Sequence, residues 1–193
     1  MALTPARVAG WAGAMVLALA LDVAASPPSP SLSDIVLRAH DGRTLALASL
    51  VPERRLTVVV FFSATCPCFA AHRSRLAALA RELEARGVQF VIVDSERHAP
   101  GEPPPAEVAE TGLPIWRDDG ARFARRLEAR YATETFVFDA AGALRYRGGI
   151  DSDRRTLTPA PRAYLREALA SLLEAKAPPL ASAKALGCAL RTR

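Results

Sequence analysis

The chain has 193 residues, half of them apolar and 23% charged, which is the balance of an ordinary globular protein. This composition excludes a wholly disordered or collagen-like chain, and three cysteines are too few for a disulfide scaffold. The net charge of +5 comes from arginines interleaved with acids, with no like-charge block longer than a pair, so we expect no nucleic-acid partner.

The first 25 residues have the order of a secretory signal peptide. Arg7 precedes a small-apolar run from Val8 to Leu21, and Val23-Ala24-Ala25 supplies the small residues of a cleavage site. The apolar run is short for a membrane span of roughly 20 residues. We therefore expect cleavage and export, to the periplasm or outside the cell, with an uncleaved membrane anchor as the alternative. Residues 26–31 form a Pro- and Ser-rich linker.

The first predicted strands come directly after this linker. Asp41-Gly42 predicts a tight turn between strands over residues 34–39 and 44–47. A continuous β-branched and aromatic run over residues 57–62 predicts a strand buried on both faces, as in a parallel sheet. Leucines at helical spacing then predict a helix over residues 66–86.

A second buried strand over residues 88–93 completes a βαβ unit with a right-handed crossover. Further along, the pattern predicts a short helix, a short strand, a helix, a two-stranded hairpin and a last helix, over residues 106–111, 113–116, 121–130, 134–147 and 161–175. Residues 32–176 are thus expected to form one α/β domain, followed by a tail over residues 177–193 that carries Gly187-Cys188.

The chemistry is concentrated at Thr65-Cys66-Pro67-Cys68, after a buried strand and at the start of a helix. The free amides of the first turn and the helix dipole stabilise an anion there. A thiol in this position loses its proton more easily, so we predict that Cys66 is a nucleophile. Pro67 suits the first turn, where no backbone hydrogen bond is lost.

These segments resemble the thioredoxin-like superfamily, within its exported redoxin branch, which is similar to alkyl hydroperoxide reductases and thiol-specific antioxidants. The resemblance is carried by Val58 to Pro67, Val91 to Ser95, Thr135 to Asp151, and Lys184 to Cys188. It implies a thioredoxin-like fold, in which a central mixed β-sheet is flanked by helices, here with an N-terminal hairpin extension. It also implies thiol–disulfide or peroxide chemistry.

The chain departs from this family at two positions. Phe69 stands where the second cysteine of a Cys-x-x-Cys pair would be, and the extra cysteine is Cys68. Since helical residues two apart point to nearly opposite faces, a Cys66–Cys68 disulfide requires a non-helical turn. Thr133 occupies the place of the family's cis-proline, so we expect a trans bond, a backbone edge for substrate, and less shielding of the thiols from metals.

Two further side chains have open roles. His72 follows Cys68 by one helical turn and could be a metal ligand or a base for Cys68. Cys188 could resolve a mixed disulfide with Cys66 or Cys68, or be a free thiol or an intermolecular partner.

The leading hypothesis is an exported thiol–disulfide oxidoreductase that acts on protein disulfides or dithiols, with a thiol reductant and no required cofactor. Cys66 attacks, and Cys68 or Cys188 resolves the intermediate. The first alternative is a thiol peroxidase, for which Ser63 stands three residues before Cys66, although Phe62 replaces the usual proline.

A second alternative is a copper- or zinc-binding redoxin without turnover, which would use Cys66, Cys68 and His72 as ligands. A third is an interaction domain that has the fold and no activity.

Overall fold

The structure is a computed structural model, and it describes residues 30–99, 107–108 and 111–192. The predicted signal peptide, and the linker up to residue 29, lie outside these residues. Among the helices of the described part, none is long and apolar enough to cross a membrane.

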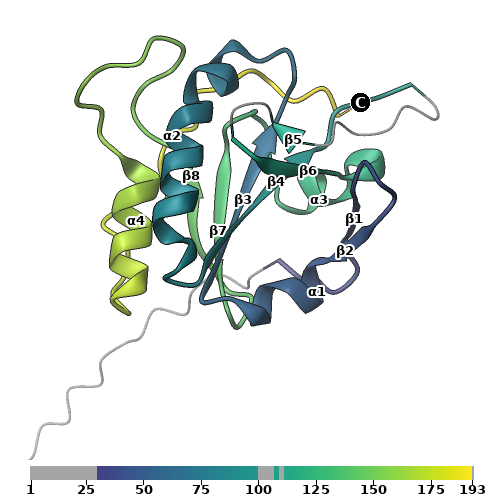
Figure 1. The fold of residues 1–193 in the computed structure, drawn as a ribbon, viewed down its shortest axis with the longest axis horizontal. Helices are drawn as coiled ribbons and strands as arrows, with labels where there is room; N and C mark the ends of the chain where they lie inside the picture. Colours follow the sequence, from purple (N-terminus) through teal and green to yellow (C-terminus); the bar gives the residue numbers. More distant parts are fainter. Residues whose placement is uncertain (1–29, 100–106, 109–110, 193) are drawn as a thin grey trace, which may run out of the picture.

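A single mixed β-sheet forms the centre of the molecule (Figure 1). Its strands are β1 (Val36–Arg38), β2 (Thr44–Ala46), β3 (Leu56–Phe62), β4 (Val88–Asp94), β5 (Glu107–Val108), β6 (Leu113–Arg117), β7 (Thr135–Asp139) and β8 (Leu144–Gly148). They are ordered β2-β1-β6-β4-β3-β7-β8, and β5 pairs with β6. Strands β3, β4 and β6 run parallel, whereas β7 is antiparallel to β3. This is the thioredoxin-like α/β fold expected from the sequence, with its N-terminal hairpin.

Helices cover both faces of the sheet. The helical segments are α1 (Leu47–Leu50), η1 (Val51–Glu53), α2 (Pro67–Glu84), η2 (Asp119–Ala121), α3 (Arg122–Arg126) and α4 (Tyr164–Leu173). One core lies between the sheet and α2 with α4, and a second lies between the sheet and α1, η1 and α3. The sheet therefore separates two hydrophobic layers, and its central strand β3 is buried on both faces.

The central strand β3 shows why its sequence has no polar alternation. All seven of its residues are buried. Val58 and Val60 belong to the core under α2 and α4, whereas Val59 and Phe61 belong to the core under α1 and α3. Successive side chains point to opposite faces of a strand, so a strand between two cores must be apolar throughout.

Helix α2 starts at the end of β3 and carries the cysteines at its first turn. Cys66 is the N-cap residue, Pro67 is the first helical residue, and Gly87 follows the helix with a φ of +81°. Leu76, Leu79 and Leu83 are buried against the sheet, as their spacing predicted.

The structure corrects two sequence predictions. The helix predicted over residues 121–130 is only α3, because Ala121 and Glu128 have left-handed φ angles of 53° on either side of it. In place of the helix predicted over residues 106–111, the strand β5 pairs antiparallel with β6, while residues 106, 109 and 110 lie outside the described part.

The tail after α4 is packed onto the domain. Ser182 bridges to Arg147 of β8, and Ala189 bridges to Tyr131. In Figure 1 the tail, drawn in yellow, crosses beside the start of α2. A Cβ on Gly149 would lie 2.7 Å from the carbonyl oxygen of Lys184, so this glycine lets the tail approach β8. The tail is thus part of the fold and returns to the site at the start of α2.

Candidate functional site

Three cysteine sulfurs converge at the start of α2. The Sγ atoms of Cys66, Cys68 and Cys188 all lie within 4.8 Å of one another. Cys66 and Cys68 are buried and Cys188 is half-buried, and all three are free thiols. The structure therefore brings the tail cysteine to the Cys-Pro-Cys turn.

The geometry of the N-cap explains how Cys66 and Cys68 face the same way. Cys66 has φ −85° and ψ 109°, which is extended backbone, and only Pro67 begins the helix. The opposite-face rule holds for residues that are both helical. A Cys66–Cys68 disulfide was expected to require a non-helical turn, and the extended backbone of Cys66 at the N-cap provides it.

Backbone contacts hold Cys188 in place. The Ala132 amide donates a hydrogen bond to the carbonyl oxygen of Cys188 at 2.9 Å. The Leu190 amide donates to the carbonyl oxygen of Arg130, also at 2.9 Å. A Cβ on Gly187 would overlap the carbonyl oxygen of Ala132, so the tail can take this path only with glycine there. The Gly-Cys pair thus has a physical reason: the glycine allows the approach that places the cysteine.

The end of the tail is tied to the turn before Cys66. Glu96, whose side chain is only 5% exposed, pairs with Arg191 at 2.9 Å. Ser63 donates its hydroxyl to the same carboxylate at 2.9 Å, and Arg191 also donates to Thr65 Oγ1 at 3.3 Å. The side chains of Ser63 and Thr65 therefore hold the end of the tail, and neither forms a hydrogen bond to a cysteine sulfur.

The environment separates the proton affinities of two cysteines. Burial opposes ionisation of Cys66, but hydrogen bonds from the Cys188 thiol and the Phe69 amide outweigh it and lower the pKa of Cys66. Burial raises the pKa of Cys188, and so does its hydrogen bond to Cys66. Of these two thiols, Cys66 is therefore the first to lose its proton, and its thiolate can accept a hydrogen bond from the protonated Cys188.

His72 is buried beneath the cysteine turn and contacts only acceptors. Its Nδ1 lies 2.7 Å from the Cys68 carbonyl oxygen, and its Nε2 lies 3.0 Å from Asp151 Oδ1. A carbonyl and a carboxylate both accept, so the imidazolium form, with hydrogen on both ring nitrogens, satisfies both contacts. Burial opposes this charge, but the bond to Asp151 raises the pKa of His72 above its ordinary value. Neither ring nitrogen is directed at a sulfur, and His72 is not brought into the group of possible metal ligands.

The same carboxylate joins α2 to the loop before α4. Arg75 donates to Asp151 at 2.6 Å and to Asp153 at 2.7 Å. It also donates to the Thr158 carbonyl oxygen at 2.7 Å, and Asp153 accepts from the Thr158 amide at 2.8 Å. We call the loop over residues 151–158 the arginine loop, because Arg154 and Arg155 lie within it. Sequence analysis missed this network, since its members are polar residues with no common spacing.

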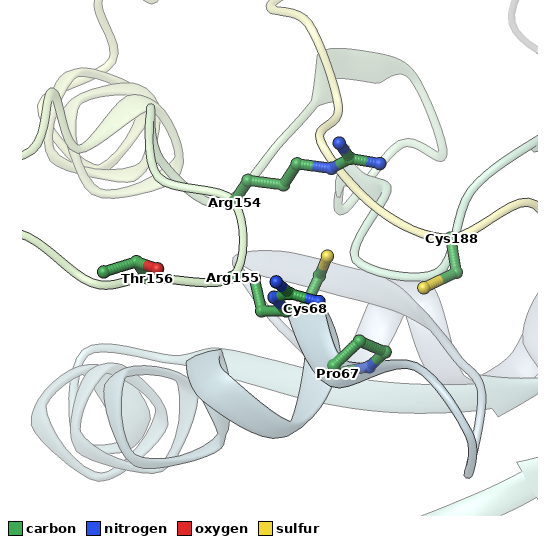
Figure 2. A pocket seen from close by; sticks show the side chains of 6 residues that line it. All are labelled: Pro67, Cys68, Arg154, Arg155, Thr156 and Cys188. Atoms are coloured by element: carbon green, nitrogen blue, oxygen red, sulfur yellow. The ribbon is translucent and has the colours of Figure 1, made fainter.

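A cavity of about 430 Å³ opens beside the sulfurs. It is lined by Pro67, Cys68, Arg154, Arg155, Thr156 and Cys188. Figure 2 shows the two arginines reaching from the arginine loop toward the side where the two sulfurs lie. The cavity is thus a place where a small molecule or an extended segment could meet the thiols.

Thr133 lies between the end of β3 and the tail. It is buried, with a φ of +78°, and its amide donates to the Phe61 carbonyl oxygen at 2.9 Å. Every peptide bond between the described residues is trans, including the one before Thr133. Proline fixes φ near −65° and has no amide hydrogen, so it could not take this conformation or make this bond. Thr133 therefore binds the end of β3 through its backbone amide, and its conformation is not one that proline can adopt.

Solved structures with the same fold include two of similar extent. One is a hypothetical protein, SMc02350, from Sinorhizobium meliloti, with a TM-score of 0.71, 23% identity, and coverage of 86% of this chain and 96% of its own. Another is an uncharacterized conserved protein from Geobacillus kaustophilus, with a TM-score of 0.70, 24% identity, and coverage of 85% and 92%.

A Xanthomonas campestris bacterioferritin comigratory protein, studied for alkyl peroxide reduction, has a TM-score of 0.52 at 13% identity, with coverage of 78% of this chain and 94% of its own. No curated protein sequence matches this chain. The Redoxin family model matches residues 25–161, which include β1 to β8 and the cysteine turn. The chain therefore belongs to the Redoxin family.

Proposed function

We propose that this redoxin is a thiol–disulfide oxidoreductase in which Cys66 is the nucleophile and Cys188 is the resolving cysteine. The observation that carries the proposal is the convergence of three sulfurs within 4.8 Å at a helix N-terminus. Protein disulfides have an S–S bond of about 2.05 Å, so small side-chain movements join two of these sulfurs. Cys188 is the side chain whose interaction lowers the pKa of Cys66, which favours that pair over Cys66 and Cys68.

The reaction consists of two exchanges. The Cys66 thiolate attacks one sulfur of the substrate disulfide, the substrate S–S bond breaks, and one substrate thiolate leaves. Cys188 then loses its proton and attacks Cys66 Sγ, which releases the second substrate thiol and leaves a Cys66–Cys188 disulfide. Two electrons pass from the protein to the substrate, and a thiol reductant restores the protein.

Access to Cys66 depends on the tail. Cys66 is 2% exposed, whereas Cys68 and Cys188 line the cavity. A substrate disulfide in the cavity therefore lies beside Cys188, and a small shift of the tail exposes the thiolate behind it. The tail thus has two roles in this proposal: it covers the nucleophile and it carries the resolving thiol.

The test is to oxidise the reduced protein with one equivalent of a small disulfide and to locate the protein disulfide by peptide mass spectrometry. We expect a Cys66–Cys188 bond. Cys188→Ser should stop at a mixed disulfide on Cys66, whereas Cys68→Ser should still close the Cys66–Cys188 bond. A bond between Cys66 and Cys68 in the wild type would overturn the assignment of Cys188.

A peroxidase would give a different result in the same experiment. Hydrogen peroxide in place of the disulfide should oxidise Cys66 slowly, because Ser63 donates its hydroxyl to Glu96 and Arg191 is paired with that carboxylate. Neither group is therefore available to a peroxide at Cys66. Oxidation by peroxide much faster than by disulfide would favour the thiol peroxidase.

The three sulfurs also support a second candidate function, the binding of a copper or zinc ion. Zn–S bonds of about 2.3 Å in a tetrahedral site place sulfurs about 3.8 Å apart, so the observed limit of 4.8 Å needs little contraction. Soft thiolates favour Cu(I) and Zn(II), and Cys188 takes the ligand position that sequence analysis assigned to His72.

Anaerobic incubation of the reduced protein with each metal, followed by native mass spectrometry, tests this candidate. One retained ion per chain is expected, and none in Cys66→Ser. Equal retention by wild type and by the triple Cys→Ser variant would refute the site.

We also propose that the protein is exported, with cleavage after Ala25. In an oxidising compartment a thiol pair of this kind can be kept oxidised or can exchange with other disulfides. N-terminal sequencing of protein from the periplasmic or extracellular fraction should begin at or near Ser26. A cytosolic protein that retains Met1 would refute export.

A further inference from the structure

We infer that the cavity beside the cysteines selects disulfides that carry carboxylates, with Arg154 and Arg155 as the groups that bind them. This inference rests on the proposed thiol–disulfide exchange and names its substrate class. The arginine loop supports it in three ways: it is positively charged, its two arginines have no ion pair within the described residues, and its flanks are bonded to α2.

The first observation is that Arg154 and Arg155 are unpaired. Many other arginines of the described chain pair with carboxylates, as do Arg38 with Asp119, Arg126 with Asp34 and Arg166 with Glu82. Within the described residues, neither Arg154 nor Arg155 makes a hydrogen bond or an ion pair. The two neighbouring guanidinium groups thus lack an internal anion.

The second observation is that these arginines stand on an anchored loop. Asp151 and Asp153 precede them, are almost fully buried, and bind Arg75 of α2. On the other side, Thr158 bonds both to Asp153 and to Arg75. Because both flanks are fixed to the helix that carries the cysteines, the two arginines are held at a defined place relative to the sulfurs.

The third observation is the shape of the site. The cavity of about 430 Å³ has Cys68 and Cys188 on its wall together with both arginines. This volume suits a small ligand. Guanidinium groups bind carboxylates through paired hydrogen bonds. A short disulfide with a carboxylate on each arm can therefore place its sulfurs at the thiols and a carboxylate at the arginine loop.

A series of three disulfides with equal arms tests the inference: dithiodipropionate, bis(hydroxyethyl) disulfide and cystamine, which are anionic, neutral and cationic. Each oxidises the reduced protein dithiol to a disulfide and leaves as two thiols. We expect the wild type to react fastest with the anion, relative to the reaction of each probe with a free thiol. In Arg154→Ser/Arg155→Ser the ratio of anionic to cationic rates should fall about tenfold.

The matched control is Arg81→Ser/Arg86→Ser. This variant removes the same charge from two exposed arginines, Arg81 in the last turn of α2, about 20 Å from the cysteines by helical rise, and Arg86 just after the helix. Its rate ratio should match that of the wild type. A wild type without charge preference, or an equal loss in the control variant, would overturn the inference while leaving the exchange reaction intact.

A second measurement does not depend on redox activity. Suberate has the chain length of dithiodipropionate and no sulfur, so its binding reports the arginines alone. Calorimetry should show that suberate binds the wild type and the control variant, and binds Arg154→Ser/Arg155→Ser at least tenfold more weakly. Equal affinity in all three proteins would overturn the inference, whereas failure of all three disulfides to react would overturn the proposed function alone.

Discussion

The buried pair of His72 and Asp151 makes a strong prediction for Asp151→Asn. The substitution keeps the shape of the side chain and removes the charge. The two side chains are only 3% and 4% exposed, so little solvent can replace the lost partner. Removing one member of a buried ion pair typically costs about 3–5 kcal/mol. We expect that loss in the free energy of unfolding, because the imidazolium would remain buried without its carboxylate.

The pH dependence of stability gives a second readout of the same pair. The pKa of His72 is raised above 6.5, so its contribution is complete below pH 6.5 and is lost as pH rises through the higher folded pKa. The pKa of Asp151 is lowered below 3.8, so its contribution is present above pH 3.8 and is lost as pH falls through the folded pKa. Above pH 6.5 the wild-type free energy of unfolding should fall by up to about 1.4 kcal/mol per pH unit.

Urea unfolding followed by circular dichroism, on either side of pH 6.5, measures both effects. In thermal unfolding, Asp151→Asn should lower the melting temperature by about 6–20 °C, and in urea unfolding it should flatten the alkaline fall in stability. Glu82→Gln is the control, since Glu82 pairs with Arg166 at the surface and should cost less than about 1 kcal/mol. A loss below about 1 kcal/mol in Asp151→Asn, with an unchanged pH profile, would refute the assignment of an imidazolium to His72.

Three further predictions concern the cysteine turn and the tail. Gly187→Ala should displace the tail, because its Cβ would overlap Ala132, so Cys66 should be alkylated faster and Cys66–Cys188 closure should slow; unchanged alkylation of Cys66 would contradict this role. Thr133→Pro should destabilise the protein by more than about 1 kcal/mol, as measured by urea unfolding, whereas Thr133→Gly should cost little because φ is +78°. The alkylation rate of Cys66 should reach its plateau at lower pH than that of Cys188, because hydrogen bonds lower one pKa and burial raises the other; a common midpoint would count against the thiolate assignment.

The sequence by itself determined the elements that depend on local pattern. The unbroken apolar run of β3 indicated a strand between two cores, and the leucine spacing of α2 indicated its buried face. The position of Cys66 between these elements indicated the N-terminus of a helix, and in the structure Cys66 is the N-cap residue of α2. These predictions succeed because strand and helix periods are properties of neighbouring residues. The helix expected over residues 121–130 failed for a local reason, since left-handed residues on either side of α3 override a weak apolar pattern.

Only the tertiary structure decided what surrounds the thiols. The sequence left open whether Cys188 meets Cys66, and the fold brings the sulfurs together because Gly187 lets the tail pass close to Ala132. It suggested His72 as a ligand or base, but the carbonyl of Cys68 and the carboxylate of Asp151 occupy both ring nitrogens. The arginine loop reaches the cavity through bonds between side chains that no short spacing relates. The period of a helix shows which face a residue occupies. The residue that it contacts there comes from a distant segment, so the contact depends on how the whole chain packs.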